Sequence, residues 1–298
     1  MRIGITGATG LIGRAFSKLA TASGHEVVAY SRRNTPTKNT TQTLRMPADA
    51  PHKLPETRLD ALVHLAGEPL TGLWTASKRE RIWKSRVDLT EALMDHVKSW
   101  SPTNRPPVVL GGSGIGFYGS RGDSVLDETS PRGSGFLADL CGQWEAAAHR
   151  ASAWDARIIH LRTSMVLARE GGAYPLMRQA FRCGMGGRLG SGRQWMSWIH
   201  VDDEAAMILW ALENSSLQGP LNLCSPAPEL NSNFTRKLAH SLHRPAFMHA
   251  PAFALRLLLR GMADEMLLCS QKAVPGTAGQ EGYHFAFPTL EGALADLR

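Results

Sequence analysis

Apolar runs that favour β-strands alternate with segments of helical periodicity through the first half of the chain. The runs lie at 2–6, 25–30, 59–67, 108–111 and 157–162, and the helical patterns lie at 11–23, 74–100 and 136–152. The run at 59–67 has the continuous apolar character of a parallel strand that is buried on both faces. This alternation through residue 168 predicts an α/β fold, a doubly wound parallel sheet of the Rossmann type with helices on both faces.

The pattern changes at about Ala168 to helices separated by short strands. Helical segments are expected at 204–213, 234–243, 251–268 and 289–297. No internal repeat or flexible linker separates the two parts. We therefore divide the chain into a Rossmann domain, residues 1–167, and a smaller α/β lobe, residues 168–298, from which segments can return to the main sheet.

Three glycines follow the first strand directly. Gly7, Gly10 and Gly13 stand in a turn from which a helix begins at about Leu11. Gly7 permits the turn, Gly10 lets backbone N–H groups approach a pyrophosphate, and Gly13 lets the helix pack closely on the strand. The spacing is GxxGxxG and not GxGxxG, so a simple glycine-rich turn is the alternative. The succession of strand, turn, helix and strand favours dinucleotide binding, and the residues expected to line the cofactor are Gly7, Thr9, Gly10, Leu11, Ile12 and Gly13.

The end of the second strand indicates which dinucleotide binds. An NAD-binding unit places Asp or Glu there to accept a hydrogen bond from the ribose 2′-hydroxyl, whereas this chain has Ser31, Arg32 and Arg33. Guanidinium groups and a hydroxyl suit a 2′-phosphate, which a carboxylate would repel. The sequence therefore predicts NADP(H), bound through Ser31 and Arg32.

Charge and composition exclude several other classes of protein. The 298 residues carry a formal net charge of +7, but the basic residues are dispersed and only Lys78–Arg81 approaches a cluster. No helix-turn-helix, zinc finger or aromatic RNA-binding signature is present, so no nucleic-acid partner is expected, and an anionic cofactor and substrate account for the charge.

The cysteines and the apolar stretches predict the cellular setting. The 4 cysteines are scattered without the spacing of a metal site, so we expect reduced thiols and no bound metal. No secretory segment precedes the first strand, and Arg256 interrupts the apolar stretch 252–259. We expect a cytoplasmic protein with no membrane association, and the sequence predicts no oligomeric state.

A set of motifs spans almost the whole chain. They are Thr6–Gly13, Ser31-Arg32, His64–Pro69, Ser85-Arg86, Gly116–Gly119, Phe136–Ala138, Gly186–Trp195, Trp198–Asp203, Gly219–Asn222 and Arg244–Ala246. With these motifs the chain resembles the extended short-chain dehydrogenase/reductase superfamily of sugar-nucleotide epimerases and dehydratases. Within it, the chain is most similar to the atypical branch of epimerase family proteins, the SDR39U1-like group.

The resemblance implies further cofactor contacts. Leu65, Ala66 and Gly67 would line the cofactor, and we include Glu68, the next residue, in the same set. Arg86 stands where the superfamily keeps a structural Asn on its long central helix, from which it can reach the cofactor. Met165 would approach the nicotinamide, and the smaller lobe would face the substrate.

The resemblance also exposes a departure at the expected catalytic centre. The superfamily transfers protons with Tyr and Lys four residues apart on a helix, and here Phe136 and Leu140 stand at those positions. Ser113 lies near the superfamily serine. Tyr118 is a candidate for a relocated acid or base if a cation such as Arg86 comes within hydrogen-bond reach, and its alternative role is packing beside the cofactor.

One arginine in the smaller lobe is a candidate for substrate binding. Arg193 follows the glycine-rich stretch 184–192, which lacks the Lys-Ser/Thr of a phosphate-binding P-loop. Its guanidinium can hold an anionic group, and its alternative is a solvated surface charge. Two functions follow: an NADP(H)-dependent oxidoreductase or epimerase-like protein acting on a small sugar-like or anionic substrate, or a catalytically silent NADP(H)-binding regulator or redox sensor.

Overall fold

A parallel sheet of seven strands forms the centre of the molecule in a computed structural model that describes residues 1–32 and 37–298. The strands are β1 (Arg2–Thr6), β2 (Glu26–Ser31), β3 (Gln42–Arg45), β4 (Ala61–His64), β5 (Val108–Gly114), β7 (Arg157–Thr163) and β12 (Gly219–Leu223). Their order across the sheet is β12-β7-β5-β4-β1-β2-β3, and every adjacent pair is parallel. The predicted doubly wound sheet is therefore confirmed.

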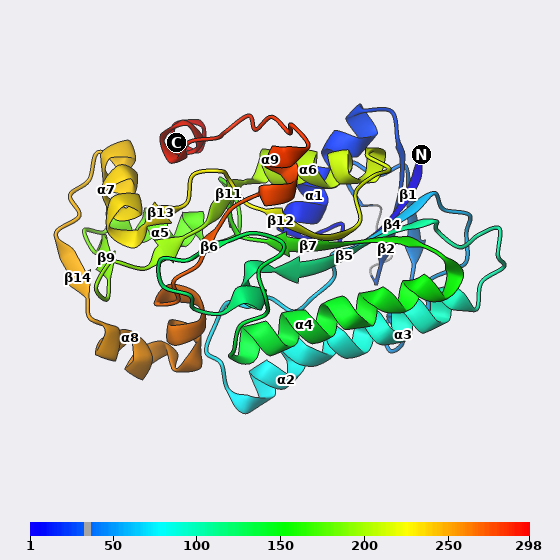
Figure 1. The fold of residues 1–298 in the computed structure, drawn as a ribbon, viewed down its shortest axis with the longest axis horizontal. Helices are drawn as coiled ribbons and strands as arrows, with labels where there is room; N and C mark the ends of the chain where they lie inside the picture. The colour runs from blue at the N-terminus through cyan, green and yellow to red at the C-terminus, as the bar shows by residue number, and fades with distance from the viewer. Residues whose placement is uncertain (33–36) are drawn as a thin grey trace.

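Helices cover both faces of this sheet (Figure 1). The helices α1 (Leu11–Ala22) and α6 (Val201–Glu213) lie on one face, and α3 (Val87–Lys98) and α4 (Phe136–His149) lie on the other. Leu62 and Val63, consecutive in β4 and both fully buried, pack into the two different layers: Leu62 with Leu93 of α3, and Val63 with Phe16 of α1. Burial on both faces explains why this strand is apolar at every position.

The predicted helix 74–100 is wrong as a single element. It is divided into α2 (Ala76–Lys84) and α3, and the chain bends at Ser85 and Arg86. The Ser85 hydroxyl accepts a hydrogen bond from the backbone N–H of Glu68 at 2.9 Å, and the Arg86 guanidinium donates one to the Glu68 carbonyl at 2.8 Å. These contacts to the loop after β4 fix the bend. They could not be predicted from local helix propensity, because they join residues that are distant in the sequence.

The chain beyond residue 167 contributes to both parts of the molecule. The helix α6 packs against α1, and β12 forms the edge of the main sheet beside β7. The remaining segments form a smaller region of short strand pairs and helices at one end of the sheet (Figure 1). Its elements are β8 (Met165–Leu167), α5 (Tyr174–Arg182), β9 (Gly187–Leu189), β10 (Trp195–Met196), β11 (Trp198–His200), β13 (Glu229–Leu230), α7 (Asn231–Leu242), β14 (Met248–Ala250) and α10 (Leu290–Asp296).

The apolar run at 251–268 forms two short elements and not one helix. They are α8 (Ala252–Leu259) and a π-helical turn, η3 (Ala263–Leu267). Among the residues that the structure describes, no helix combines the length and the apolar character needed to cross a bilayer.

Candidate functional site

Most of the predicted site residues lie along one edge of the sheet, where the carboxyl ends of its parallel strands meet. Following the strand order, they are Ser31 and Arg32 at the end of β2, Gly7–Gly13 after β1, Leu65–Glu68 after β4, Ser113–Tyr118 in β5 and the 3₁₀ turn η1 (Ile115–Tyr118), and Met165 after β7. In open α/β sheets this edge is where ligands bind. The fold therefore brings together residues from distant parts of the sequence.

The glycine loop has the shape that a diphosphate requires. Gly7 has φ +78°, and a Cβ there would lie 2.8 Å from the Leu65 carbonyl carbon. A Cβ on Gly13 would lie 2.2 Å from the Gly7 carbonyl oxygen, so the helix α1 can pack here only with glycine. Among the described residues, a Cβ on Gly10 would meet just one atom within 4 Å, the Gly7 oxygen at 3.2 Å, so this part of the chain leaves the space in front of Gly10 open.

The N-terminus of α1 provides the complementary charge. Gly10 is its N-cap, no side chain of the described residues accepts a hydrogen bond at this cap, and no acidic residue lies in the first turn. The free backbone N–H groups and the positive end of the helix dipole therefore face the open space. Residues of this shape and charge fit a pyrophosphate.

Three other predicted residues border the same loop. Thr9 is exposed, whereas Leu11 and Ile12 are half-buried at the start of α1. The Leu11 side chain is covered by a loop that the sequence analysis missed, since Cβ atoms on Gly171 and Gly172 would lie 3.6 and 3.1 Å from it. The two consecutive glycines were the feature of the sequence from which this loop could have been predicted.

The end of β2 presents the residues proposed for the 2′-phosphate. Ser31 is the last residue of the strand and is 9% exposed, and Arg32 follows it on the surface. Arg33, the second arginine of the predicted pair, lies outside the described residues. Ser31 and Arg32 thus lie at the carboxyl end of β2, where a 2′-phosphate would be bound, and their contact with it stays a prediction.

Arg86 lies beside the loop after β4. Its guanidinium carbon is 5.2 Å from the centre of the Trp144 ring, and a Cβ on Gly67 would lie 3.1 Å from that carbon. Burial lowers the pKa of Arg86 to about 10, so the group stays charged at neutral pH. A fixed cation therefore borders the loop Leu65–Glu68, and a role in cofactor binding stays a prediction.

The Glu68 carboxylate points toward α2. It accepts a hydrogen bond from Lys78 at 2.8 Å, and this contact lowers the pKa of Glu68. Arg81 lies 3.6 Å away on the same helix. The side chain therefore joins the loop after β4 to α2, and its predicted contact with the cofactor is untested.

The two candidate catalytic hydroxyls belong to one buried polar network. Ser113 donates to Glu145 at 2.7 Å, and Tyr118 donates to Asn222 at 2.7 Å. Arg162 connects the halves: its Nη1 donates to the Tyr118 hydroxyl at 3.0 Å, and its Nε and Nη2 donate to the Glu145 carboxylate at 2.8 and 3.0 Å. The cation beside Tyr118 is therefore Arg162 and not Arg86.

This network constrains the chemistry of Tyr118. The side chain is fully buried, and burial raises the pKa of its hydroxyl to about 12. The phenol therefore keeps its proton at neutral pH and donates a hydrogen bond through it to the Asn222 side-chain oxygen. The described contacts hold Tyr118 within the protein, and both its catalytic role and its packing beside a cofactor stay predictions.

The ion pair between Arg162 and Glu145 at the centre of this network was not predicted from the sequence. Arg162 is 4% exposed and Glu145 is 9% exposed. Two signals were available: an arginine within a strand of the buried type, and a glutamate in the apolar stretch of the helix at 136–152. Neither signal identifies its partner, because the two residues lie on different elements.

The positions of the missing Tyr and Lys are occupied by apolar packing. Leu140 is 1% exposed and packs with Trp74, and the ring of Phe136 meets the Trp74 ring edge-on at 5.4 Å. The first turn of α4 thus offers no side chain that transfers a proton at these positions.

The remaining predicted residues lie in the smaller region. Met165 begins β8, is half-buried and pairs with Trp198 of β11. Arg193 is exposed in the turn between β9 and β10, where its backbone N–H donates to Ser191 at 3.2 Å. Its proposed contact with substrate is untested.

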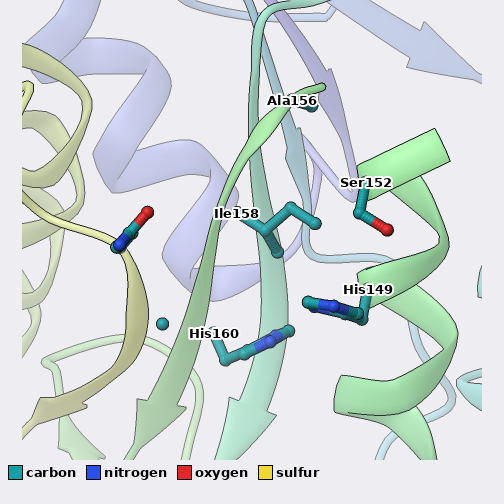
Figure 2. A pocket seen from close by; sticks show the side chains of 7 residues that line it. His149, Ser152, Ala156, Ile158 and His160 are labelled. Atoms are coloured by element: carbon teal, nitrogen blue, oxygen red, sulfur yellow. The ribbon is translucent and has the colours of Figure 1, made fainter. Parts of the chain in front are cut away.

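A cavity of about 440 Å³ lies apart from these residues, beside the edge strand β12. Its lining is His149, Ser152, Ala156, Ile158, His160, Gln218 and Gly219. Figure 2 shows the imidazoles of His149, from α4, and His160, from β7, facing the same space. None of its lining residues is a predicted cofactor or catalytic residue. Within the described ranges, no three His, Cys, Asp or Glu side chains gather as metal ligands.

The chain is similar in sequence to known protein families over most of its length. The profile of the NAD dependent epimerase/dehydratase family matches residues 3–224, and that of DUF1731, a domain of unknown function, matches residues 250–297. An epimerase family protein of Mycobacterium leprae is 37% identical, with 98% of this chain and 94% of the relative covered. The epimerase family protein SDR39U1 of Bos taurus is 36% identical, with 100% and 99% covered.

The fold is also similar to that of a solved structure over the whole chain. The crystal structure of the human epimerase family protein SDR39U1 (isoform 2) with NADPH superposes with a TM-score of 0.90 at 33% identity, covering 100% of this chain and 99% of the human one. The similarity thus extends over both the large sheet and the smaller region.

Proposed function

Since the chain belongs to the NAD dependent epimerase/dehydratase family, we propose that it binds NADP(H) along the carboxyl edge of its seven-stranded sheet. The observation that carries this proposal is the open space in front of Gly10 at the uncapped N-terminus of α1. There the pyrophosphate would lie, with the 2′-phosphate at Ser31 and Arg32 and the nicotinamide toward Met165. The NADPH in the human SDR39U1 structure supports NADP(H) over NAD(H).

Replacing Arg32 tests the choice of cofactor. Arg32→Ala should weaken NADPH binding about ten- to hundredfold, because a charge-assisted hydrogen bond to phosphate is lost, and should leave NADH binding nearly unchanged. Titration calorimetry with both nucleotides measures the difference. The control is Lys18→Ala, which removes an exposed cation of α1. Equal losses for NADPH and NADH would remove Arg32 from the 2′-phosphate site.

The first candidate activity is that of an oxidoreductase or epimerase. A bound nicotinamide would supply or accept hydride, while the chain must hold a small sugar-like or anionic substrate and move a proton. On this proposal the Ser113 and Tyr118 hydroxyls would orient the reacting oxygen and transfer the proton, and Arg193 would hold an anionic group of the substrate. Tyr118 would have to exchange its present bond to Asn222 for one to the substrate.

A second candidate function is a catalytically silent NADP(H)-binding regulator. The observation that favours it is that Phe136 and Leu140 occupy the positions of the superfamily acid and its lysine, while both candidate hydroxyls are already bonded within the protein. On this proposal the small molecule is an effector, and the protein reports which form of the dinucleotide is bound.

Turnover separates the two candidates. The protein should be screened with NADPH and libraries of carbonyl compounds and sugar nucleotides, and Tyr118→Phe should be tested on any active pair. If Tyr118 transfers the proton, the variant should lose at least about a hundredfold in kcat, because general acid–base catalysis contributes that much. Unchanged turnover would discard Tyr118 as the proton donor. Failure of the whole screen, with NADPH bound, would favour the regulator.

A further inference from the structure

Arg79 differs from the other cations of α2 in having no anionic partner. Lys78 and Arg81 pair with Glu68 at 2.8 and 3.6 Å, and Lys84 pairs with a glutamate one turn away at 2.7 Å. In the part of the chain that the structure describes, no carboxylate lies within 4 Å of the Arg79 guanidinium, and no acceptor takes a hydrogen bond from it. Its Nε is buried without a partner.

The Arg79 guanidinium is nevertheless held in place on two sides. Its central carbon lies 5.4 Å from the centre of the Phe136 ring, which in turn packs on the buried Trp74. On the other side a Cβ on Gly261 would lie 2.2 Å from the Arg79 Nη2, so the backbone after α8 approaches the guanidinium closely. The group therefore lies between the start of α4 and the backbone at Gly261, and a guanidinium placed in this way has less entropy to lose on binding than one extended into solvent.

The nearby acidic residue does not neutralise Arg79. Glu265 in η3 accepts hydrogen bonds from the backbone N–H groups of Phe136 and Leu137 at 2.9 and 3.1 Å, and so caps α4. The two carboxylate oxygens are used by the helix end, and no ion pair joins Glu265 to Arg79. A partly desolvated guanidinium without a counter-charge is unfavourable, and an anion from outside the chain would relieve this cost.

We propose that Arg79 binds a carboxylate or phosphate group of the small molecule, against Phe136 and between α2 and the segment 261–265. The planar guanidinium matches either oxyanion through two parallel hydrogen bonds. The phenylalanine that replaces the superfamily tyrosine supplies the ring that supports this cation, so the position serves anion recognition. The identification of the anion as part of a substrate or effector rests on the proposed function, and the anion site itself does not.

Arginine Nε–H NMR signals of the NADPH-loaded protein test this site. The signal that disappears in Arg79→Lys identifies Arg79. Titration with oxalate and with inorganic phosphate, against chloride at equal ionic strength, should shift this signal saturably. Backbone amides of 261–265 should shift in parallel, and in Arg79→Lys their apparent dissociation constant should rise at least about tenfold. Lys84→Ala, which removes an exposed cation of the same helix, should leave the titration unchanged.

The outcomes distinguish this inference from the proposed function. A protein that binds NADPH but whose Arg79 signal stays constant, or shifts equally with chloride, would overturn the inference and leave the cofactor assignment intact. A saturable response in a protein that fails to bind NADPH would support the anion site and overturn the cofactor assignment. A stronger response to oxalate indicates a carboxylate ligand, and a stronger response to phosphate indicates a phosphate ester.

Discussion

Replacing Gly10 with aspartate is expected to abolish NADP(H) binding while the protein stays folded. Within residues 1–32 and 37–298, a Cβ at this position would meet only the Gly7 oxygen at 3.2 Å, and the backbone has φ −72° and ψ 174°, which any residue adopts. The new carboxylate would accept hydrogen bonds from the helix N–H groups that the pyrophosphate requires, and its negative charge would repel the pyrophosphate. We expect the dissociation constant for NADPH to rise at least about a hundredfold, measured by calorimetry.

The stability of Gly10→Asp should change little or increase. Aspartate is a favoured N-cap residue, and α1 now has no side-chain cap, so the melting temperature should be equal or higher. The control is Gly279→Asp, the same change at a glycine whose Cβ would meet no atom of the described residues within 4 Å. Retained NADPH affinity in the stable Gly10→Asp protein would show that the pyrophosphate does not lie at this helix end.

Replacing Arg162 with methionine is expected to destabilise the protein more than any of the substitutions predicted above. The change leaves the buried Glu145 carboxylate without the donors at 2.8 and 3.0 Å and removes a hydrogen bond to Tyr118. Removing one partner of a buried ion pair costs about 3–5 kcal/mol. Urea denaturation at neutral pH should report a decrease of this size in the free energy of unfolding.

Two further variants test whether the loss comes from an unpaired buried carboxylate. Arg256→Met breaks an exposed arginine–carboxylate pair with a distance of 2.8 Å, and should cost less than about 1 kcal/mol. The double variant Arg162→Met with Glu145→Leu removes both charges and should recover part of the loss, since no buried carboxylate remains unpaired. A loss for Arg162→Met as small as that for Arg256→Met would contradict a buried, coupled network.

The local sequence determined the large sheet and the position of the glycine loop. Strands such as 59–67 are recognised because burial on both faces demands continuous apolar residues. The glycines at 7, 10 and 13 are recognised because a tight turn, an open approach and close helix packing each require glycine at a fixed spacing within one short segment. The family motifs could likewise be identified without a structure, and so could the replacement of the superfamily Tyr and Lys by Phe136 and Leu140.

Only the tertiary structure decided the contacts between distant segments. The bend at Ser85 and Arg86 depends on the loop after β4, and the buried bonds of Ser113 and Tyr118 depend on Glu145, Arg162 and Asn222 from three other elements. A periodic pattern reports which face of an element is buried, but not which residue of another element it meets. The lone guanidinium of Arg79 is informative for the same reason: a charge lacks a partner only with respect to the folded chain around it.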